Sequence, residues 1–187
     1  RLEGDLRRAI DNREFEVHYQ PKYDIQAEMP ILKSAEALVR WRHPELGMIP
    51  PGDFIPLFER NGQINLVDKY VWAEAAQQIA AWRERYGVTI PISVNLSRVD
   101  VFDPELEGTL EALIEKNGLA YGDLKLEVTE SAYSDDTDFI ISRVNELRSR
   151  GFRVEMDDFG TGYSSLGMIS SLPIDALKLD MIFVRNA

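Results

Sequence analysis

The chain has 187 residues, of which 44% are hydrophobic and 28% charged, so it fits one globular domain with a sizeable core. The formal net charge of −11 argues against a broad basic surface for a nucleic-acid polymer, and no apolar run approaches the ~20 residues that span a bilayer. The absence of cysteine excludes disulfides and thiolate metal ligands.

The cellular setting follows from the same features. A chain without cysteine and without a visible secretory signal fits a reducing cytoplasm, where we expect the domain to lie even if its parent is anchored to a membrane. Because the first residue is Arg1 and not methionine, we expect the sequence to be part of a longer protein.

The first half of the chain alternates helical and extended patterns. In chain order, the expected elements are a helix over residues 2–12, a strand over 15–20, a strand over 31–41, a helix over 54–60 and a helix over 66–85. Pro21 is expected to end the first strand.

The second half repeats strand and helix regularly. The expected elements are a strand over 92–96, a helix over 104–117, a strand over 124–128, a helix over 138–150, a strand over 153–156, a short helix around 165–170 and a strand over 176–179. This alternation predicts an α/β protein built from parallel units, with a TIM-like (β/α) barrel as the best-fitting closed form. Six strands are expected where a closed barrel needs about eight, and the first strand is the candidate for an antiparallel member.

Two adjacent acids, Asp157 and Asp158, end an apolar strand and lead into the glycine-rich turn Phe159-Gly160-Thr161-Gly162. Carboxylates at a strand tip are well placed to hold a divalent cation, and strand tips are where barrel enzymes carry their chemistry. A turn or capping role is the alternative for an isolated pair.

Further oxygen donors occupy the same kind of position. Glu36, Asn95 and Glu127 each lie at or near the end of a short β-rich run that a helical pattern follows. Hard oxygen ligands from several strand ends suit Mg²⁺ or Mn²⁺ better than zinc.

Five stretches together resemble the signatures of a known family. In order, they are Glu36-Ala37-Leu38-Val39-Arg40-Trp41, the strand with Asn95, Glu127-Val128-Thr129-Glu130, Asp157-Asp158-Phe159-Gly160-Thr161-Gly162 and Leu177-Lys178-Leu179-Asp180. The chain is therefore similar, from about Phe15 to its last residue, to the EAL-domain family of bacterial cyclic di-GMP phosphodiesterases and their non-catalytic relatives.

The resemblance implies a centre with two cations, Mg²⁺ or Mn²⁺. By similarity, the first cation would be held by four residues: Glu36, Asn95, Glu127 and Asp157. Asp157 would bridge to a second cation held by Asp158. Glu36 and Lys178 would be the catalytic residues, with Lys178 orienting the attacking water; a strand-end lysine that reaches solvent is the alternative.

The resemblance also implies substrate contacts and a supported loop. Gln20, Leu38 and Arg40 would contact cyclic di-GMP, although Gln20 also fits a turn-side amide and Arg40 a surface ion pair. Glu130 has the opposite strand parity to Glu127, so by similarity it would, with Thr129, brace the loop after Asp158. An exposed glutamate is the alternative for Glu130.

One departure from the family pattern concerns the expected length. The family's domain continues with two more strands that carry a glutamate ligand and a glutamine near the substrate, so residues 1–187 are expected to be a partial EAL domain. An open sheet edge favours homodimerisation, and the parent is expected to carry sensor or cyclase domains.

The expected function is metal-dependent hydrolysis of cyclic di-GMP to the linear dinucleotide, with feeble or no activity in this piece alone. Two alternatives stay open: a non-catalytic cyclic di-GMP receptor, and a dimerisation scaffold. The presence of both Glu36 and the Asp157–Asp158 pair favours the enzyme.

Overall fold

The structure is a computed structural model and describes residues 2–26, 28–134, 136–160, 172–181 and residue 185. The short helix expected around 165–170 and the second half of the glycine-rich turn, Thr161-Gly162, lie outside the described residues. None of the helices in the described part of the chain is both long and apolar enough to cross a membrane.

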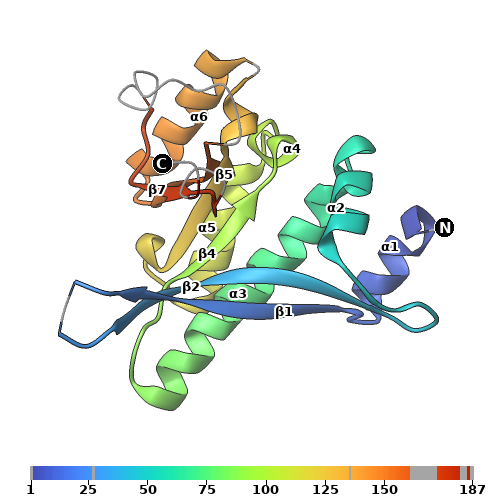
Figure 1. The fold of residues 1–187 in the computed structure, drawn as a ribbon, viewed down its shortest axis with the longest axis horizontal. Coiled ribbons are helices and arrows are strands. Elements are labelled where there is room, and N and C mark those ends of the chain that lie inside the picture. The colour runs from blue at the N-terminus through green and yellow to red at the C-terminus, as the bar shows by residue number, and fades with distance from the viewer. Residues whose placement is uncertain (1, 27, 135, 161–171, 182–184, 186–187) are drawn as a thin grey trace.

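Strands and helices alternate along the described chain (Figure 1). The strands are β1 (Phe15–Asp24), β2 (Ile31–His43), β3 (Gly47–Ile49), β4 (Ile92–Leu96), β5 (Leu124–Thr129), β6 (Val154–Phe159) and β7 (Ala176–Leu179). The helices are α1 (Leu2–Asp11), α2 (Pro51–Arg60), α3 (Ile64–Tyr86), α4 (Arg98–Val101), α5 (Leu106–Asn117) and α6 (Thr137–Ser149), with short 3₁₀ helices η1 (Tyr121–Asp123) and η2 (Glu130–Ser134).

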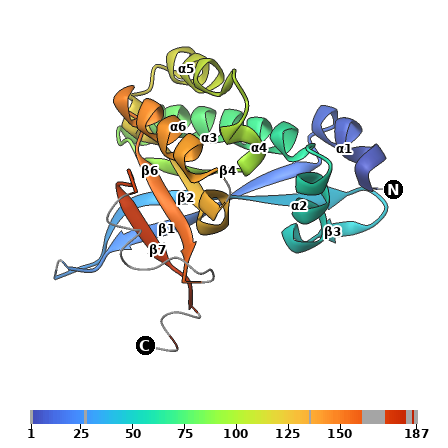
Figure 2. The same ribbon diagram turned by 90° about the horizontal axis from the view of Figure 1, so that it is seen from above.

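One mixed sheet organises the fold. Its strand order is β1-β2-β4-β5-β6-β7, with β3 on β2; β1 pairs antiparallel to β2, and β4 to β7 run parallel to their neighbours. The sheet curls like part of a barrel, and helices α3, α5 and α6 lie together on one side of it (Figure 2). The expected α/β class and the antiparallel first strand are therefore confirmed.

The structure corrects one expected strand end and adds two elements that were not expected. Pro21 does not end β1, which continues to Asp24; as a strand at the edge of the described sheet, β1 tolerates a residue that cannot donate a backbone hydrogen bond. Strand β3, only three residues long, was not expected. Helix α4, which the capping box of Ser97 and Asp100 starts, was not expected; the helix expected over 104–117 is present as α5.

Helix α3 connects the hydrophobic core to the end of β4, where Asn95 lies. Its buried stripe includes Val67, Val71 and Trp72, as the helical spacing predicts. The Trp72 indole is fully buried, and its Nε1 donates to the backbone oxygen of Asn95 at 2.9 Å. This bond fixes the end of β4 against α3. Gly87, with φ of 69°, then ends the helix in the left-handed conformation that glycine adopts without strain.

Candidate metal-binding active site

Strand parity brings the predicted donors to one face of the sheet. Successive strand residues point to opposite faces of the sheet. The side chains of Asn95, Glu127 and Asp157 therefore point to the face opposite to that of the residues just before and after them in the chain. The register sets Asn95 opposite Glu127 on the adjacent strand. Glu36 on β2 and Lys178 on β7 complete the group from either side.

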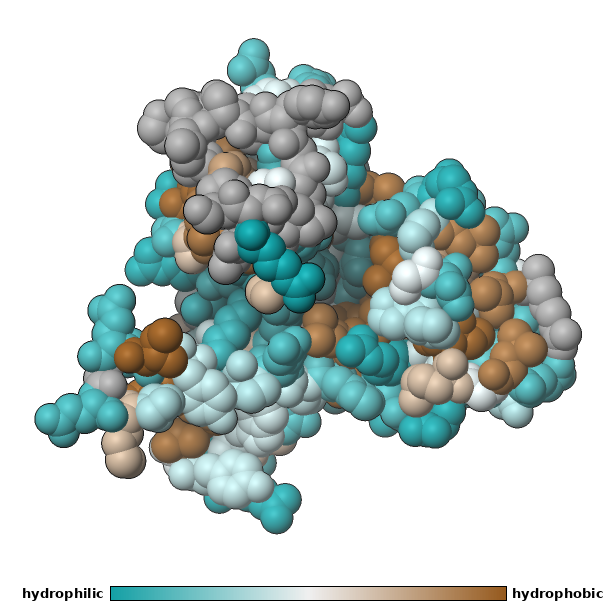
Figure 3. Space-filling model, in the orientation of Figure 1, coloured by the Kyte–Doolittle hydropathy of each residue, from teal (hydrophilic) through white to brown (hydrophobic). Residues whose placement is uncertain are grey.

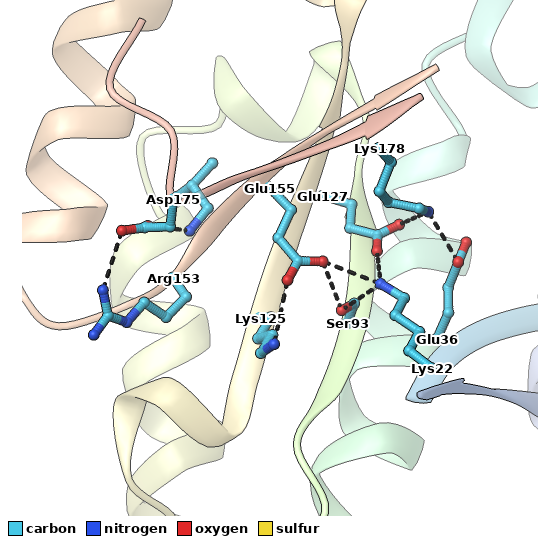
Figure 4. A network of polar contacts seen from close by, with 10 residues as sticks. Lys22, Glu36, Ser93, Lys125, Glu127, Arg153, Glu155, Asp175 and Lys178 are labelled. Atoms are coloured by element: carbon cyan, nitrogen blue, oxygen red, sulfur yellow. Dashed lines mark hydrogen bonds and ion pairs between the residues drawn. The ribbon is translucent and has the colours of Figure 1, made fainter. Parts of the chain in front are cut away.

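The three carboxylates of this group converge. Glu36, Glu127 and Asp157 each offer an oxygen that lies within 4.8 Å of the others. The Lys178 ammonium lies among them, with Nζ 2.9 Å from Glu36 Oε2 and 2.8 Å from Glu127 Oε2 (Figure 4). The same Nζ lies 3.1 Å from Asp157 Oδ1. Three oxygen donors already gathered around a cationic group are chemically suited to a hard divalent ion.

Charge and burial act against each other in this cluster. Burial alone would lower the pKa of Lys178, but its hydrogen bonds with Glu127 and Glu36 raise that pKa above the usual value for lysine. Burial raises the pKa of the fully buried Glu127, and the hydrogen bonds from Lys178 and Lys22 oppose that rise. The Lys178 ammonium is thus held firmly charged among the carboxylates.

Asp158 reaches the site by a local irregularity of β6. The β6–β7 register shifts between Met156 and Phe159, and Asp158 has a positive φ of 56°. Irregularities of this kind redirect side chains next to active sites, and aspartate tolerates left-handed backbone better than most residues. Burial, followed by the nearby charges of Asp157 and Asp180, raises the pKa of Asp158.

A cavity of about 620 Å³ adjoins the carboxylates. Asn95, Asp157 and Asp158 form its polar wall, and Leu38 and Arg40 line it from β2. It lies between α2 and the tips of β4 and β6, where Figure 3 shows a hollow bordered by hydrophilic and hydrophobic residues. A ligand there would contact the acidic cluster on one side and Arg40 on the other.

Gln20 lies elsewhere. It is exposed on β1, opposite Glu36 in the β1–β2 register, and it does not line the cavity in the described part of the chain. A contact between Gln20 and a ligand in this cavity would therefore require the ligand to extend toward β1.

Glu130 and Thr129 lie behind the acid pair. Glu130 is buried, and its Oε2 accepts a hydrogen bond from the Gly160 backbone N–H at 2.9 Å. Thr129 pairs in register with Asp157, and its Oγ1 contacts Ser131 Oγ at 3.1 Å. Glu130 therefore anchors the start of the glycine-rich segment, whose further residues lie outside the described part.

Sequence reasoning missed a second group of charged residues beside Glu127. Lys22 forms ion pairs with Glu127 and Glu155, and Lys125 forms an ion pair with Glu155 (Figure 4). The available signal was spacing, because Lys125 and Glu155 lie two residues before Glu127 and Asp157 and so share their faces. Lys22 had no such signal once Pro21 was expected to end its strand.

Asp68 was also missed. It lines the cavity from α3, is buried, and its Oδ2 has no hydrogen-bond partner among the described residues. Burial, then the charge and hydrogen bond of Asp100, raise its pKa well above the usual value for aspartate. In the sequence, an acidic residue on the apolar stripe of a helix cannot be distinguished from an ordinary polar interruption of that stripe, so nothing pointed to Asp68.

Comparison with known proteins identifies the domain. The family model described as EAL domain matches residues 3–187. The chain belongs to the EAL domain family. The expected membership is thus confirmed.

Relatives of known name share the whole chain. Cyclic di-GMP phosphodiesterase PdeR of Escherichia coli (strain K12) is 37% identical over 185 residues, 99% of this chain and 27% of that protein. Cyclic di-GMP phosphodiesterase NbdA of Pseudomonas aeruginosa is 37% identical over 186 residues, 99% of this chain and 23% of that protein. The chain thus spans about a quarter of these curated relatives.

A solved structure supports the fold as well. The structure titled PaMucR phosphodiesterase, c-di-GMP complex, superposes with a TM-score of 0.89 at 37% identity, covering 99% of this chain and 74% of that chain. The EAL domain of FimX matches with a TM-score of 0.87 at 19% identity, which supports the fold alone. The described arrangement of strands is therefore that of an EAL domain.

Proposed function

We propose that this EAL domain hydrolyses one phosphodiester bond of cyclic di-GMP and releases the linear dinucleotide, in a reaction that depends on Mg²⁺ or Mn²⁺. The observation that carries the proposal is the convergence of Glu36, Glu127 and Asp157, with ligand atoms within 4.8 Å of one another, beside a cavity. The relatives named as cyclic di-GMP phosphodiesterases support the choice of substrate.

The donor set suits two hard cations. Glu36, Asn95, Glu127 and Asp157 would hold the first, and Asp157 would be shared with a second held by Asp158. Bound divalent cations would make water easier to deprotonate near neutral pH and offset charge on the phosphoryl oxygens. The neutral amide of Asn95 limits the accumulation of negative charge among the carboxylates.

The remaining residues orient substrate and water. Lys178 keeps its protons, so its ammonium would hold the attacking water by donating hydrogen bonds. Arg40 on the cavity wall would bind two oxygens of one phosphate, because a guanidinium presents paired donors. Leu38 would contact an apolar face of the nucleotide, and Gln20 would contact a part of the ligand that extends toward β1.

Thr129 and Glu130 would support the loop after Asp158. The hydrogen bond from the Gly160 N–H to Glu130 Oε2 supports this role, since it ties the end of β6 to the residue after β5. A loop held in this way would keep Asp158 near the second cation.

We propose further that the domain acts in the cytoplasm, as a homodimer and linked to sensor or cyclase domains in a longer parent. The name of a third relative, bifunctional diguanylate cyclase/cyclic di-GMP phosphodiesterase MucR of Pseudomonas aeruginosa, 37% identical over 182 residues, supports such a linkage. Light scattering coupled to gel filtration tests the dimer: a monomer mass at micromolar concentration would contradict it.

Hydrolysis is tested by incubating the protein and its full-length parent with cyclic di-GMP and Mn²⁺, and quantifying the linear dinucleotide. Activity is expected in the parent and little or none in this chain alone. Glu36→Gln in the parent should reduce turnover by at least ~100-fold, since even residues that only support metal ligands cost 10–100-fold. Glu115→Gln, on the exposed side of α5, is the matched control and should leave turnover unchanged.

The same experiment separates the alternatives. Tight cyclic di-GMP binding without product in the parent would favour a receptor, and no binding in either protein would favour a scaffold. Robust turnover by the 187-residue chain would contradict the expectation that it is nearly inactive by itself.

A further inference from the structure

A buried polar network lies next to the carboxylate cluster. Ser93, Lys125 and Glu155 occupy β4, β5 and β6, each two residues before Asn95, Glu127 and Asp157, respectively. Barrel interiors are usually filled at such positions by branched apolar residues. Here Ser93 and Glu155 are 0% and 6% exposed, so polar groups have been retained at a substantial desolvation cost.

Lys22 joins this network to Glu127. Its Nζ donates to Glu127 Oε1 at 2.5 Å, to Ser93 Oγ at 3.0 Å and to Glu155 Oε2 at 3.1 Å (Figure 4). An ammonium has three N–H donors, so each of them has one acceptor. The ammonium is therefore fixed in orientation.

Glu155 is held in turn by several partners. Ser93 Oγ donates to Glu155 Oε2 at 3.0 Å, and Lys125 Nζ donates to Oε1 at 3.3 Å. Burial alone would raise the pKa of Glu155, but Lys22 and Lys125 lower it to about 2. Glu155 thus anchors Lys22 through the contact between Lys22 Nζ and Glu155 Oε2.

The two oxygens of Glu127 consequently have separate partners. Oε1 accepts from Lys22, and Oε2 accepts from Lys178, the residue that also contacts Glu36 and Asp157. A carboxylate bound through Oε1 cannot rotate freely, and its other oxygen stays directed toward the carboxylate cluster. This is the arrangement in which a neighbouring group orients a metal ligand.

We propose that Lys22, fixed by Ser93 and Glu155, is a positioning residue for the cation site: it holds Glu127 with Oε2 directed at the cation. The inference rests on the proposed function only in that Glu127 is taken as a cation ligand. Lys22 does not touch the cation or substrate; it acts through Glu127.

A purely electrostatic role makes the opposite prediction. A fixed positive charge near a cation site repels the cation, so loss of Lys22 would tighten cation binding if charge were all that mattered. If orientation dominates, loss of Lys22 weakens binding, because Glu127 must then be ordered when the cation binds. The sign of the change in affinity therefore distinguishes the two roles.

The test is calorimetric titration of the full 187-residue chain with Mn²⁺, comparing wild type with Lys22→Met. We expect the Mn²⁺ dissociation constant to rise by about 10- to 100-fold, the range found for residues that orient metal ligands. Lys33→Met is the matched control, because Lys33 is an exposed lysine of β2 that pairs with Asp24. Unchanged or tighter binding in Lys22→Met would overturn the proposal.

A second variant guards against misfolding. Lys22→Met/Glu155→Gln removes one positive and one negative charge together, so it leaves no buried Glu155 charge while still deleting the bond to Glu127. Its Mn²⁺ affinity should also fall if Lys22 positions Glu127, and wild-type affinity in this folded variant would overturn the proposal. Circular dichroism establishes folding for each variant.

Activity of the parent gives an independent readout. In Lys22→Met the Mn²⁺ concentration for half-maximal turnover should rise, and turnover should recover as Mn²⁺ is increased, which a general structural defect would not allow. If wild type binds Mn²⁺ and hydrolyses cyclic di-GMP but Lys22→Met behaves like wild type, only this inference fails. If wild type binds no Mn²⁺, the proposed function fails with it.

Discussion

At the scale of single residues, one backbone irregularity in β6 allows the side chains of Asp157 and Asp158 to border the same cavity. Adjacent residues of a regular strand point to opposite faces, so both acids could not line one cavity. The register shift between Met156 and Phe159 and the left-handed Asp158 remove that restriction. Both carboxylates then border the same space.

A pair of substitutions at Asp158 separates charge from conformation. Asparagine tolerates positive φ, so Asp158→Asn should keep the free energy of unfolding within about 0.5 kcal/mol of wild type while replacing the charged oxygen of the proposed second-cation ligand with a neutral one. Asp158→Val introduces a branched side chain at φ 56° and should lose about 1–3 kcal/mol more. Urea unfolding measures both, and equal stabilities would argue against a strained site.

At the scale of elements, helix α3 meets α4 through a pair of buried acids. Asp68 is buried on α3, and Asp100 of α4 accepts hydrogen bonds from Asn65 Nδ2 at 2.8 Å and from the Ser97 hydroxyl at 2.6 Å. Burial and Asp100 raise the pKa of Asp68 well above its usual value. The helix contact therefore depends on a proton that the unfolded chain releases more easily.

The pH dependence of this contact has a definite sign. Below the unfolded pKa of about 4, Asp68 is protonated in both the folded and the unfolded state, so its raised pKa does not change the free energy of unfolding. As the pH rises toward the higher folded pKa, the unfolded chain ionises first, so the folded state loses stability. Asp68→Asn should therefore raise the free energy of unfolding, by an amount that vanishes near pH 3 and grows as the pH rises from about 4 toward the folded pKa.

Denaturant titrations at several pH values measure this effect. Asp11→Asn, at the exposed end of α1, is the matched control and should give a pH profile parallel to wild type. A gain for Asp68→Asn that is independent of pH would show that the proton on Asp68 is not responsible.

At the scale of elements, part of the fold and of the site could be predicted from the sequence. Strand alternation and order place Glu36, Glu127 and Asp157 at the ends of strands in one sheet, and this much could be predicted, because parity is a local property. The extension of β1 past Pro21 could not, since it depends on the strand having a neighbour on only one side. That single wrong boundary also hid Lys22, which lies one residue beyond the proline.

Long-range contacts mark the other limit of sequence reasoning. The Lys22–Glu155 pair joins residues 133 positions apart, and the Lys178–Glu36 pair joins residues 142 positions apart. Motif resemblance supplied the second of these, because Glu36 and Lys178 belong to family signatures. Nothing in spacing or composition supplied the first, and only the curled sheet brings those residues together.

At the scale of the whole molecule, the proposed cation ligands tie together strands that are distant in the chain. Glu36, Glu127 and Asp157 come from β2, β5 and β6, so a bound cation would act as a cross-link of the folded state. Mn²⁺ at about 100 times its dissociation constant should stabilise the fold by roughly 2.7 kcal/mol. For a domain of this size the melting temperature should rise by roughly 5–11 °C.

Thermal unfolding with and without Mn²⁺ checks this expectation. A chelator should reverse the rise, and Glu36→Gln should greatly reduce it, whereas the exposed Glu115→Gln should respond like wild type. A rise that persists in Glu36→Gln would mean that Mn²⁺ binds elsewhere on this acidic protein.

The positions of the two lysines that contact Glu127 have a consequence for synthesis on the ribosome. Lys22 is translated before every carboxylate of the cluster, and Lys178 after all of them. A nascent chain that has just emerged beyond β5 therefore already contains one counter-charge for the fully buried Glu127. The N-terminal hairpin can neutralise Glu127 while β7 is still inside the exit tunnel, so the growing sheet can begin to form before Lys178 emerges.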